Sequence, residues 1–160
     1  MLHALVLGMH IAAGSAGLLL GPIAMAAPKR RGRHTRVGQA YQIAIAALTV
    51  SALGLVAFAP GRLWWLALIA CGTEAAALAG WREPRRRRPG WRPRHVGLVA
   101  GSYVSLVTAL LVVNWSSPLA WIVPTLIGTP LVARASARAA RQPEPSKPSK
   151  PSERSGYTAV

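Results

Sequence analysis

The first 27 residues, MLHALVLGMHIAAGSAGLLLGPIAMAA (residues 1–27), decide the class of this protein because they contain no Lys, Arg, Asp or Glu. A helix that crosses roughly 30 Å of bilayer hydrocarbon needs about 20 mostly apolar residues, and this stretch supplies them. Ala24-Met25-Ala26 imitates the cleavage site of a secretory signal peptide, but the stretch lacks a basic start and its apolar part is too long. We therefore expect a helix that spans a membrane.

The composition of the whole chain excludes most other classes of protein. Of 160 residues, 52% are hydrophobic, and 19 Lys and Arg against 4 Asp and Glu give a net charge of +15. A water-soluble enzyme with a mean hydropathy of +0.32 would expose more apolar surface than monomers tolerate. One cysteine, Cys71, cannot form an internal disulfide, and the absence of aspartate rules out a Ser-His-Asp triad.

Five apolar runs lie near residues 4–27, 38–59, 62–80, 96–115 and 119–133. The segments before, between and after them contain 0, 5, 1, 7, 0 and 6 Lys and Arg, with Arg62 counted in the third. Basic segments stay on the cytoplasmic side of a membrane. This alternation predicts an all-α, polytopic transmembrane helix bundle of five spans, with the N-terminus outside and the C-terminus cytoplasmic. Four spans are the alternative, because the last run contains Pro124, Gly128 and Pro130.

We expect residues 1–133 to form the transmembrane domain and residues 134–160 to form a basic, Pro/Ser/Lys-rich, disordered cytoplasmic tail. The Ala/Arg part of this tail, to about residue 141, can continue the last helix. Arginine clusters such as Arg85–Arg88 predict contact with anionic lipid headgroups rather than with nucleic acid, because the flanking spans hold them at the bilayer. The predicted location is the bacterial plasma (inner) membrane, and a homo-oligomer or a membrane complex is the expected assembly.

Three histidines are candidate functional residues. His10 shares one stripe of its helix with Gly14, Gly17 and Gly21, so it faces protein, either hydrogen-bonded to a Ser or Thr or acting as a ligand or proton relay.

His34 and His95 each precede a span that begins on the cytoplasmic side, and each is followed by a tyrosine, Tyr41 or Tyr103. Two such imidazoles on neighbouring helices can hold a haem iron. Tyr41 or Tyr103 would then belong to the layer of residues that surrounds the two histidines. The alternative is that both histidines merely belong to the basic interface.

Glu74 is the acidic residue within the predicted spans. An acid at membrane depth is costly unless it finds a partner. Cys71, Leu78 and Trp81 lie on the same helix face as Glu74, so we expect this face to pack on other spans and to offer Glu74 a His, Tyr or Ser partner. It is a candidate for a proton path, and a structural hydrogen bond or ion pair is the alternative.

The pattern of these residues resembles a family of small bacterial integral membrane proteins classified as a domain of unknown function. The resemblance covers roughly residues 8–115 and rests on His10-Ile11 with Gly21-Pro22, on His34-x-Arg36-x-Gly38-x2-Tyr41 and on His95-x6-Ser102-Tyr103. It implies a polytopic helical membrane protein. The family typically has arginine at the places taken here by Gln39 and Gly101, so the resemblance implies no role that needs those cations.

Two classes of function remain open. The first is a haem-associated or electron-transfer membrane component, with haem b as the cofactor and His10, His34 or His95 as axial ligands. The second is a non-enzymatic small transporter or accessory subunit, in which Glu74 and His10 line a proton or solute path. The sequence assigns no catalytic side chain, and it favours a protein that is not an enzyme without deciding the question.

Overall fold

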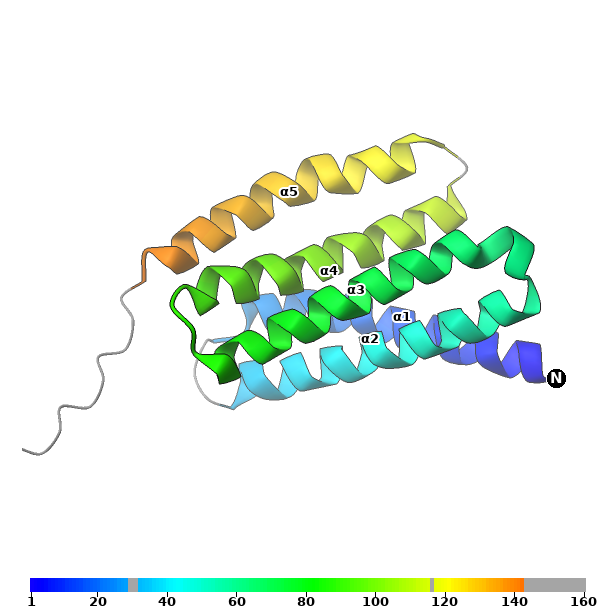
Figure 1. Cartoon of the computed structure of the whole chain (residues 1–160), viewed down its shortest axis with the longest axis horizontal. Helices are drawn as coiled ribbons and strands as arrows, with labels where there is room; N and C mark the ends of the chain where they lie inside the picture. Colours follow the sequence, from blue (N-terminus) through cyan, green and yellow to red (C-terminus); the bar gives the residue numbers. More distant parts are fainter. Residues whose placement is uncertain (29–31, 116, 143–160) are drawn as a thin grey trace, which may run out of the picture.

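A computed structural model describes residues 1–28, 32–115 and 117–142 of the chain. Over these residues the fold is all-α, as predicted, with helices α1 (Leu2–Ala26), α2 (Arg33–Phe58), α3 (Pro60–Arg86), α4 (Trp91–Asn114) and α5 (Leu119–Ala140). Successive helices run in opposite directions, so the N-terminus and the end of α5 lie at opposite ends of the molecule (Figure 1).

Four helices form the bundle, and the fifth is added to its side. Helices α1 and α3 each pack against both α2 and α4, whereas α5 packs against α4 among the described helices. Figure 1 shows α5 along one edge, beyond α4. Helix α4 therefore contacts α1, α3 and α5, and its side chains connect most of the structure.

Four of the described helices, α1, α2, α4 and α5, are long and apolar enough to cross a membrane. The fifth apolar run, interrupted by prolines, is one of them. Helix α3 is 27 residues long but falls outside this set, and its second half contains Glu74, Arg82 and Glu83. The structure therefore supports a multi-pass membrane protein, in which four of the described helices have the length and composition of a membrane span.

The helices extend beyond the apolar runs at their charged ends. Helix α3 continues to Arg86 and α5 to Ala140, so α5 includes the Ala/Arg part of the expected tail. Alanine and arginine are both good helix formers, and the turns beyond Pro130 contain no further proline before Pro143. The expected disorder of residues 143–160 lies outside the described residues.

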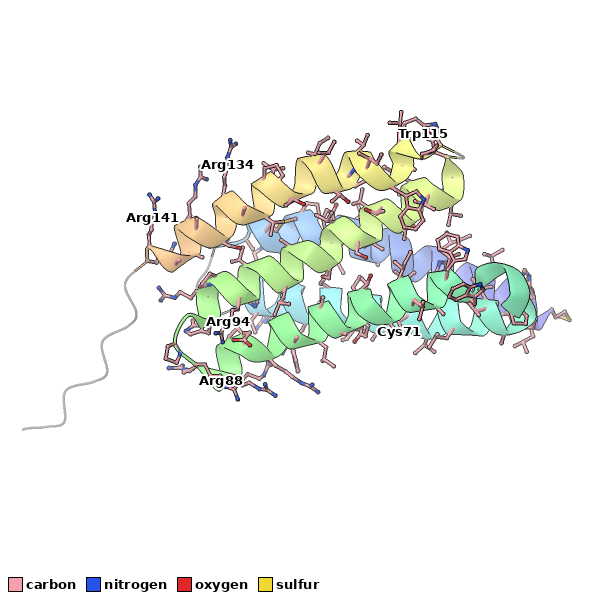
Figure 2. All side chains as sticks on the ribbon, turned by 45° about the horizontal axis from the view of Figure 1, so that its top comes forward. Cys71, Arg88, Arg94, Trp115, Arg134 and Arg141 are labelled. Atoms are coloured by element: carbon pink, nitrogen blue, oxygen red, sulfur yellow. The ribbon has the colours of Figure 1, made fainter. Side chains whose placement is uncertain are left out.

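The two ends of the bundle differ in chemistry. Arg88, Arg94, Arg134 and Arg141 gather at one end, which we call the basic end, and Trp115 lies at the other (Figure 2). At that second end the rings of Trp65 and Trp121 lie 5.6 Å apart.

The distribution of side chains suits an apolar surrounding. Buried positions are mostly small or polar, such as Ala13, Ser51 and Ser102, while large hydrophobic residues such as Ile43 and Leu126 are about 70% exposed (70% and 68%). Helices in a membrane associate through small residues and interhelical hydrogen bonds, because lipid already solvates their large apolar side chains. The small buried core centres on Tyr41, Ile45, Ala77 and Leu106.

Candidate functional site

Three backbone carbonyls near the basic end lack the N–H donor that a helix normally provides. Pro22 lies inside α1 and Pro84 inside α3, and a proline has no N–H for the carbonyl four residues earlier. The carbonyls concerned are those of Leu18 and Gly80. Ala24 is in the last turn of α1, where the residue four positions later is again a proline.

Side chains from α2 and α4 donate to all three carbonyls. The hydroxyl of Tyr103 lies 3.2 Å from the oxygen of Leu18. Nδ1 of His95 lies 2.7 Å from the oxygen of Gly80, and Nδ1 of His34 lies 2.9 Å from the oxygen of Ala24. These contacts replace missing backbone hydrogen bonds, which is how transmembrane helices tolerate prolines.

The two histidine contacts fix the protonation of the rings. A carbonyl oxygen can only accept a hydrogen bond, so Nδ1 of His34 and of His95 must carry a proton. In a neutral imidazole the remaining nitrogen, Nε2, then has the lone pair with which histidine binds metals. Metal-binding histidines are typically oriented by such a contact from their other nitrogen.

The structure brings these two rings together. His34 is the second residue of α2 and His95 the fifth of α4, and their ring centroids lie 6.2 Å apart with the planes at 78°. The predicted proximity of the two histidines is confirmed. The ring of Trp91 lies 6.5 Å from that of His95.

Glycines let α4 approach its neighbours closely at this level. A Cβ on Gly80 would lie 2.7 Å from Cγ2 and 3.1 Å from the backbone nitrogen of Val99, and a Cβ on Gly21 would overlap the ring of Tyr103. A Cβ on Gly17 would lie 3.2 Å from Cδ2 of Leu106 and 3.3 Å from Cδ1 of Ile45, so the glycine stripe of α1 packs closely against other helices.

Tyr41 and Tyr103 are both anchored by hydrogen bonds, although at different places. Tyr41 is 3% exposed, and its hydroxyl lies 3.0 Å from Oγ of Ser102. Since Ser102 donates to the carbonyl of Val99 at 2.8 Å, Tyr41 is the donor to Ser102. This contact joins α2 to α4, as Tyr103 joins α4 to α1.

His10 is separate from the histidine pair. Its Nδ1 lies 3.2 Å from Oγ of Ser51, whose hydroxyl hydrogen points to the carbonyls of Ala47 and Leu48. Because α1 rises about 1.5 Å per residue, His10 is about 21 Å along the helix from Ala24. It takes the hydrogen-bonded arrangement with a serine, one of the two alternatives that the sequence left open.

Glu74 is a half-buried residue of α3 that faces α2. Its hydrogen-bond partner on α2 is one that the sequence did not predict. Its Oε1 accepts a hydrogen bond of 2.8 Å from Nε2 of Gln42, while its Oε2 is buried without a hydrogen-bond partner among the described residues. The expected His, Tyr or Ser partner was therefore wrong. Cys71, expected on the same packed face, is exposed, and the buried positions among the described residues of α3 are Thr73, Ala77 and Gly80.

A second hydrogen bond at this depth joins α3 to α4. The hydroxyls of Thr73 and Ser105 lie 2.7 Å apart. Ser and Thr residues within the apolar runs indicate that hydrogen bonds between helices can form. The sequence does not indicate which of these residues lie opposite each other.

Among the described residues, no group of three or more His, Cys, Asp or Glu could hold a metal ion by itself. A metal at the basic end would need ligands of its own in addition to the two histidines, as a porphyrin provides. Comparison of the chain with family models, curated proteins and solved structures finds no match.

Proposed function

We propose that this protein is a membrane component of electron transfer in which His34 and His95 are the axial ligands of one haem b at the basic end. The observation that supports the proposal is the pair of imidazoles from two helices, 6.2 Å apart, each with Nδ1 donating to a backbone carbonyl.

The spacing and the donor chemistry fit this cofactor. Each iron–nitrogen bond is about 2 Å long, so two axial imidazoles place their ring centroids about 6 Å apart. The carbonyls of Ala24 and Gly80 hold both rings in the tautomer that offers Nε2, and they raise its basicity. Arginines at the same end, such as Arg94, supply positive charge for the carboxylates of a haem.

A bound haem would supply one-electron transfer, and the residues of this chain would hold and insulate it. His34 and His95 would bind the haem iron. Tyr41 and Tyr103 fix the positions of α2 and α1 against α4 through their hydrogen bonds. The close contact at Gly80 keeps α3, which carries the carbonyl partner of His95, in place.

The proposal includes the finer topology. We place five spans in a bacterial plasma membrane, with the N-terminus outside and the basic end in the cytoplasm. Support comes from the alternation of Lys and Arg counts and from α3, which packs between α2 and α4 as the spanning helices do. Membership of the small bacterial integral membrane protein family stays part of this proposal.

The test is a visible spectrum of the protein purified from cells supplied with haem precursor. We expect a Soret band and about one haem per chain in the parent, loss of most haem in H34A and H95A, and full haem content in the control H10A. His10 is a suitable control because its contact is with Ser51, far from the pair. A colourless parent, or equal haem content in all variants, would contradict the proposal.

A second function is favoured by Glu74. Its buried Oε2 lacks a hydrogen-bond partner among the described residues, and a carboxyl oxygen in that situation is suited to take up a proton. This observation supports a small transporter or accessory subunit with a proton path past Glu74. A colourless protein whose proton flux in liposomes falls in E74Q would support that function over electron transfer.

A further inference from the structure

An apolar groove of about 350 Å³ runs along α4 between α1 and α5. Helix α4 lines it from Ala100 to Leu111, α5 from Val123 to Val132, and α1 contributes Met25. Ala100 and Leu111 are eleven residue steps apart, which corresponds to about 16 Å along the helix. The groove is therefore long and narrow.

The interior of the groove offers nothing to a polar ligand. Tyr103 has the one polar side chain among the lining residues, and its hydroxyl donates to the carbonyl of Leu18. Whatever lies along α4 must be apolar over the length of the groove.

The shape of the groove suits an extended hydrocarbon chain. Apolar side chains line it over about 16 Å of α4, and it is partly open along its length, so a lipid chain can enter it from the side.

Positive charge lies just beyond one end of the groove. Ala100 and Val132 line it nearest the basic end, and the next charged residues in that direction are Arg94 on α4 and Arg134 and Arg138 on α5. Arg134 and Arg138 are exposed, and Figure 2 shows Arg134 extending from α5 near the basic end. No acidic residue lies on the described part of α5.

We infer that this groove binds one acyl chain of an anionic phospholipid, whose phosphate is held by Arg134 and Arg138 at the basic end. The chain lies against α4, and the two arginines select the headgroup because they neutralise its charge at the membrane surface. This site is independent of the histidine pair and does not depend on the proposed function.

The test measures lipid binding by native mass spectrometry on detergent-purified protein. Phosphatidylglycerol and phosphatidylcholine with the same acyl chains are the probes, so that chain and headgroup contributions separate. A100F fills the groove, with I127W as a second filling variant. A75F adds the same bulk at an exposed position of α3 and is the matched control.

The expected results are specific to each variant. Filling the groove with A100F or I127W lowers the affinity for the first phosphatidylglycerol at least tenfold, and A75F leaves it within twofold of the parent. R134Q/R138Q lowers phosphatidylglycerol affinity about tenfold and brings it to the value for phosphatidylcholine. The control R86Q/R88Q makes the same change of charge on the other side of the basic end. It should leave the phosphatidylglycerol affinity within twofold of the parent value.

Three outcomes would overturn the inference. The first is that both filling variants bind phosphatidylglycerol as the parent does. The second is that R86Q/R88Q weakens binding as much as R134Q/R138Q does, which would mean general attraction to the basic end. The third is that A100F changes the oligomeric state of lipid-free protein, which would assign the groove to a second copy.

Discussion

A proline inside a helix leaves the carbonyl four residues earlier without its donor, and in this protein two such carbonyls, in α1 and α3, accept a hydrogen bond from a candidate site residue. Tyr103 donates to the carbonyl freed by Pro22, and His95 to the one freed by Pro84. A hydrogen bond left unmade in an apolar surrounding costs more than a typical bond contributes, so these contacts stabilise the bundle.

The contact between Tyr103 and Leu18 can be tested with Pro22. Y103F removes the donor and should lower the free energy of unfolding in detergent. In a P22A background the backbone N–H returns to the carbonyl of Leu18, and the same substitution should cost less. The difference between the two effects should be about 0.5–1.5 kcal/mol, as for other interhelical hydrogen bonds in membranes. Strictly additive effects would show that Tyr103 does not replace the missing donor.

Glu74 and Gln42 form the second residue-scale test. E74Q keeps a side-chain oxygen that accepts from Gln42, so the stability of the protein should change by less than about 0.5 kcal/mol. E74A leaves the amide of Gln42 unpaired and should destabilise the protein by about 1–3 kcal/mol. Thermal unfolding in detergent measures both. If E74A is as stable as E74Q, the carboxyl of Glu74 is not held by Gln42.

The sequence predicted some of these residues and could not predict others. His34 and His95 could be paired because each begins a helix on the same side of the membrane. The Gln42 partner of Glu74 could not be predicted, because it depends on the rotation of α3 about its axis, which the nearly uniform Ala-rich sequence leaves undetermined. Pro22 indicates that the carbonyl of Leu18 needs a donor, but not that Tyr103 supplies it.

At the scale of helices, α4 is held close to α1 and α3 by the absence of side chains at two glycines. A valine at Gly80 would collide with Val99 and its backbone, and a valine at Gly21 would collide with the ring of Tyr103. G80V and G21V should each destabilise the protein by about 1–3 kcal/mol, as overpacking does.

Gly101 provides the control for this prediction. Its added Cβ would meet nothing within 4 Å, and an alanine improves helix propensity by up to about 1 kcal/mol, so G101A should be neutral or stabilising. Unfolding by denaturant in detergent measures all three variants. Equal loss of stability in G101A and G80V would contradict the close approach of α3 and α4 at Gly80.

The predicted and observed helices agree in number and approximate extent, because long apolar runs mark helices clearly. The differences lie at the charged ends. Hydropathy detects where lipid ends, whereas the helices of this protein continue to Arg86 and Ala140, where alanine and arginine still favour the helix. Gly97 and Gly101 have the spacing of two small residues four positions apart that is common where helices pack closely, but they are not a close-packed pair. A Cβ on Gly97 would be in ordinary contact with Ser136, and Gly101 faces open space.

At the scale of the whole molecule, the five described helices α1 to α5 alternate in direction and place the two ends of the described chain on opposite sides (Figure 1). We predict that a reporter fused after Gln142 is active in the cytoplasm and that one fused after Asn114 is active outside, because the basic segments remain inside. Paired reporter fusions in intact cells measure this. A Gln142 fusion that reads outside would mean that α3 does not span and that four helices do.

The central claim is that two histidines from different helices hold one iron, and the spin state of ferric protein loaded with haem tests it most directly. Two axial imidazoles should give a low-spin electron paramagnetic resonance spectrum in the parent, and H34A or H95A should convert the remaining haem to a high-spin form with one axial histidine. H10A should keep the low-spin spectrum. Haem that does not bind at all, or a low-spin spectrum that persists in both H34A and H95A, would contradict the account.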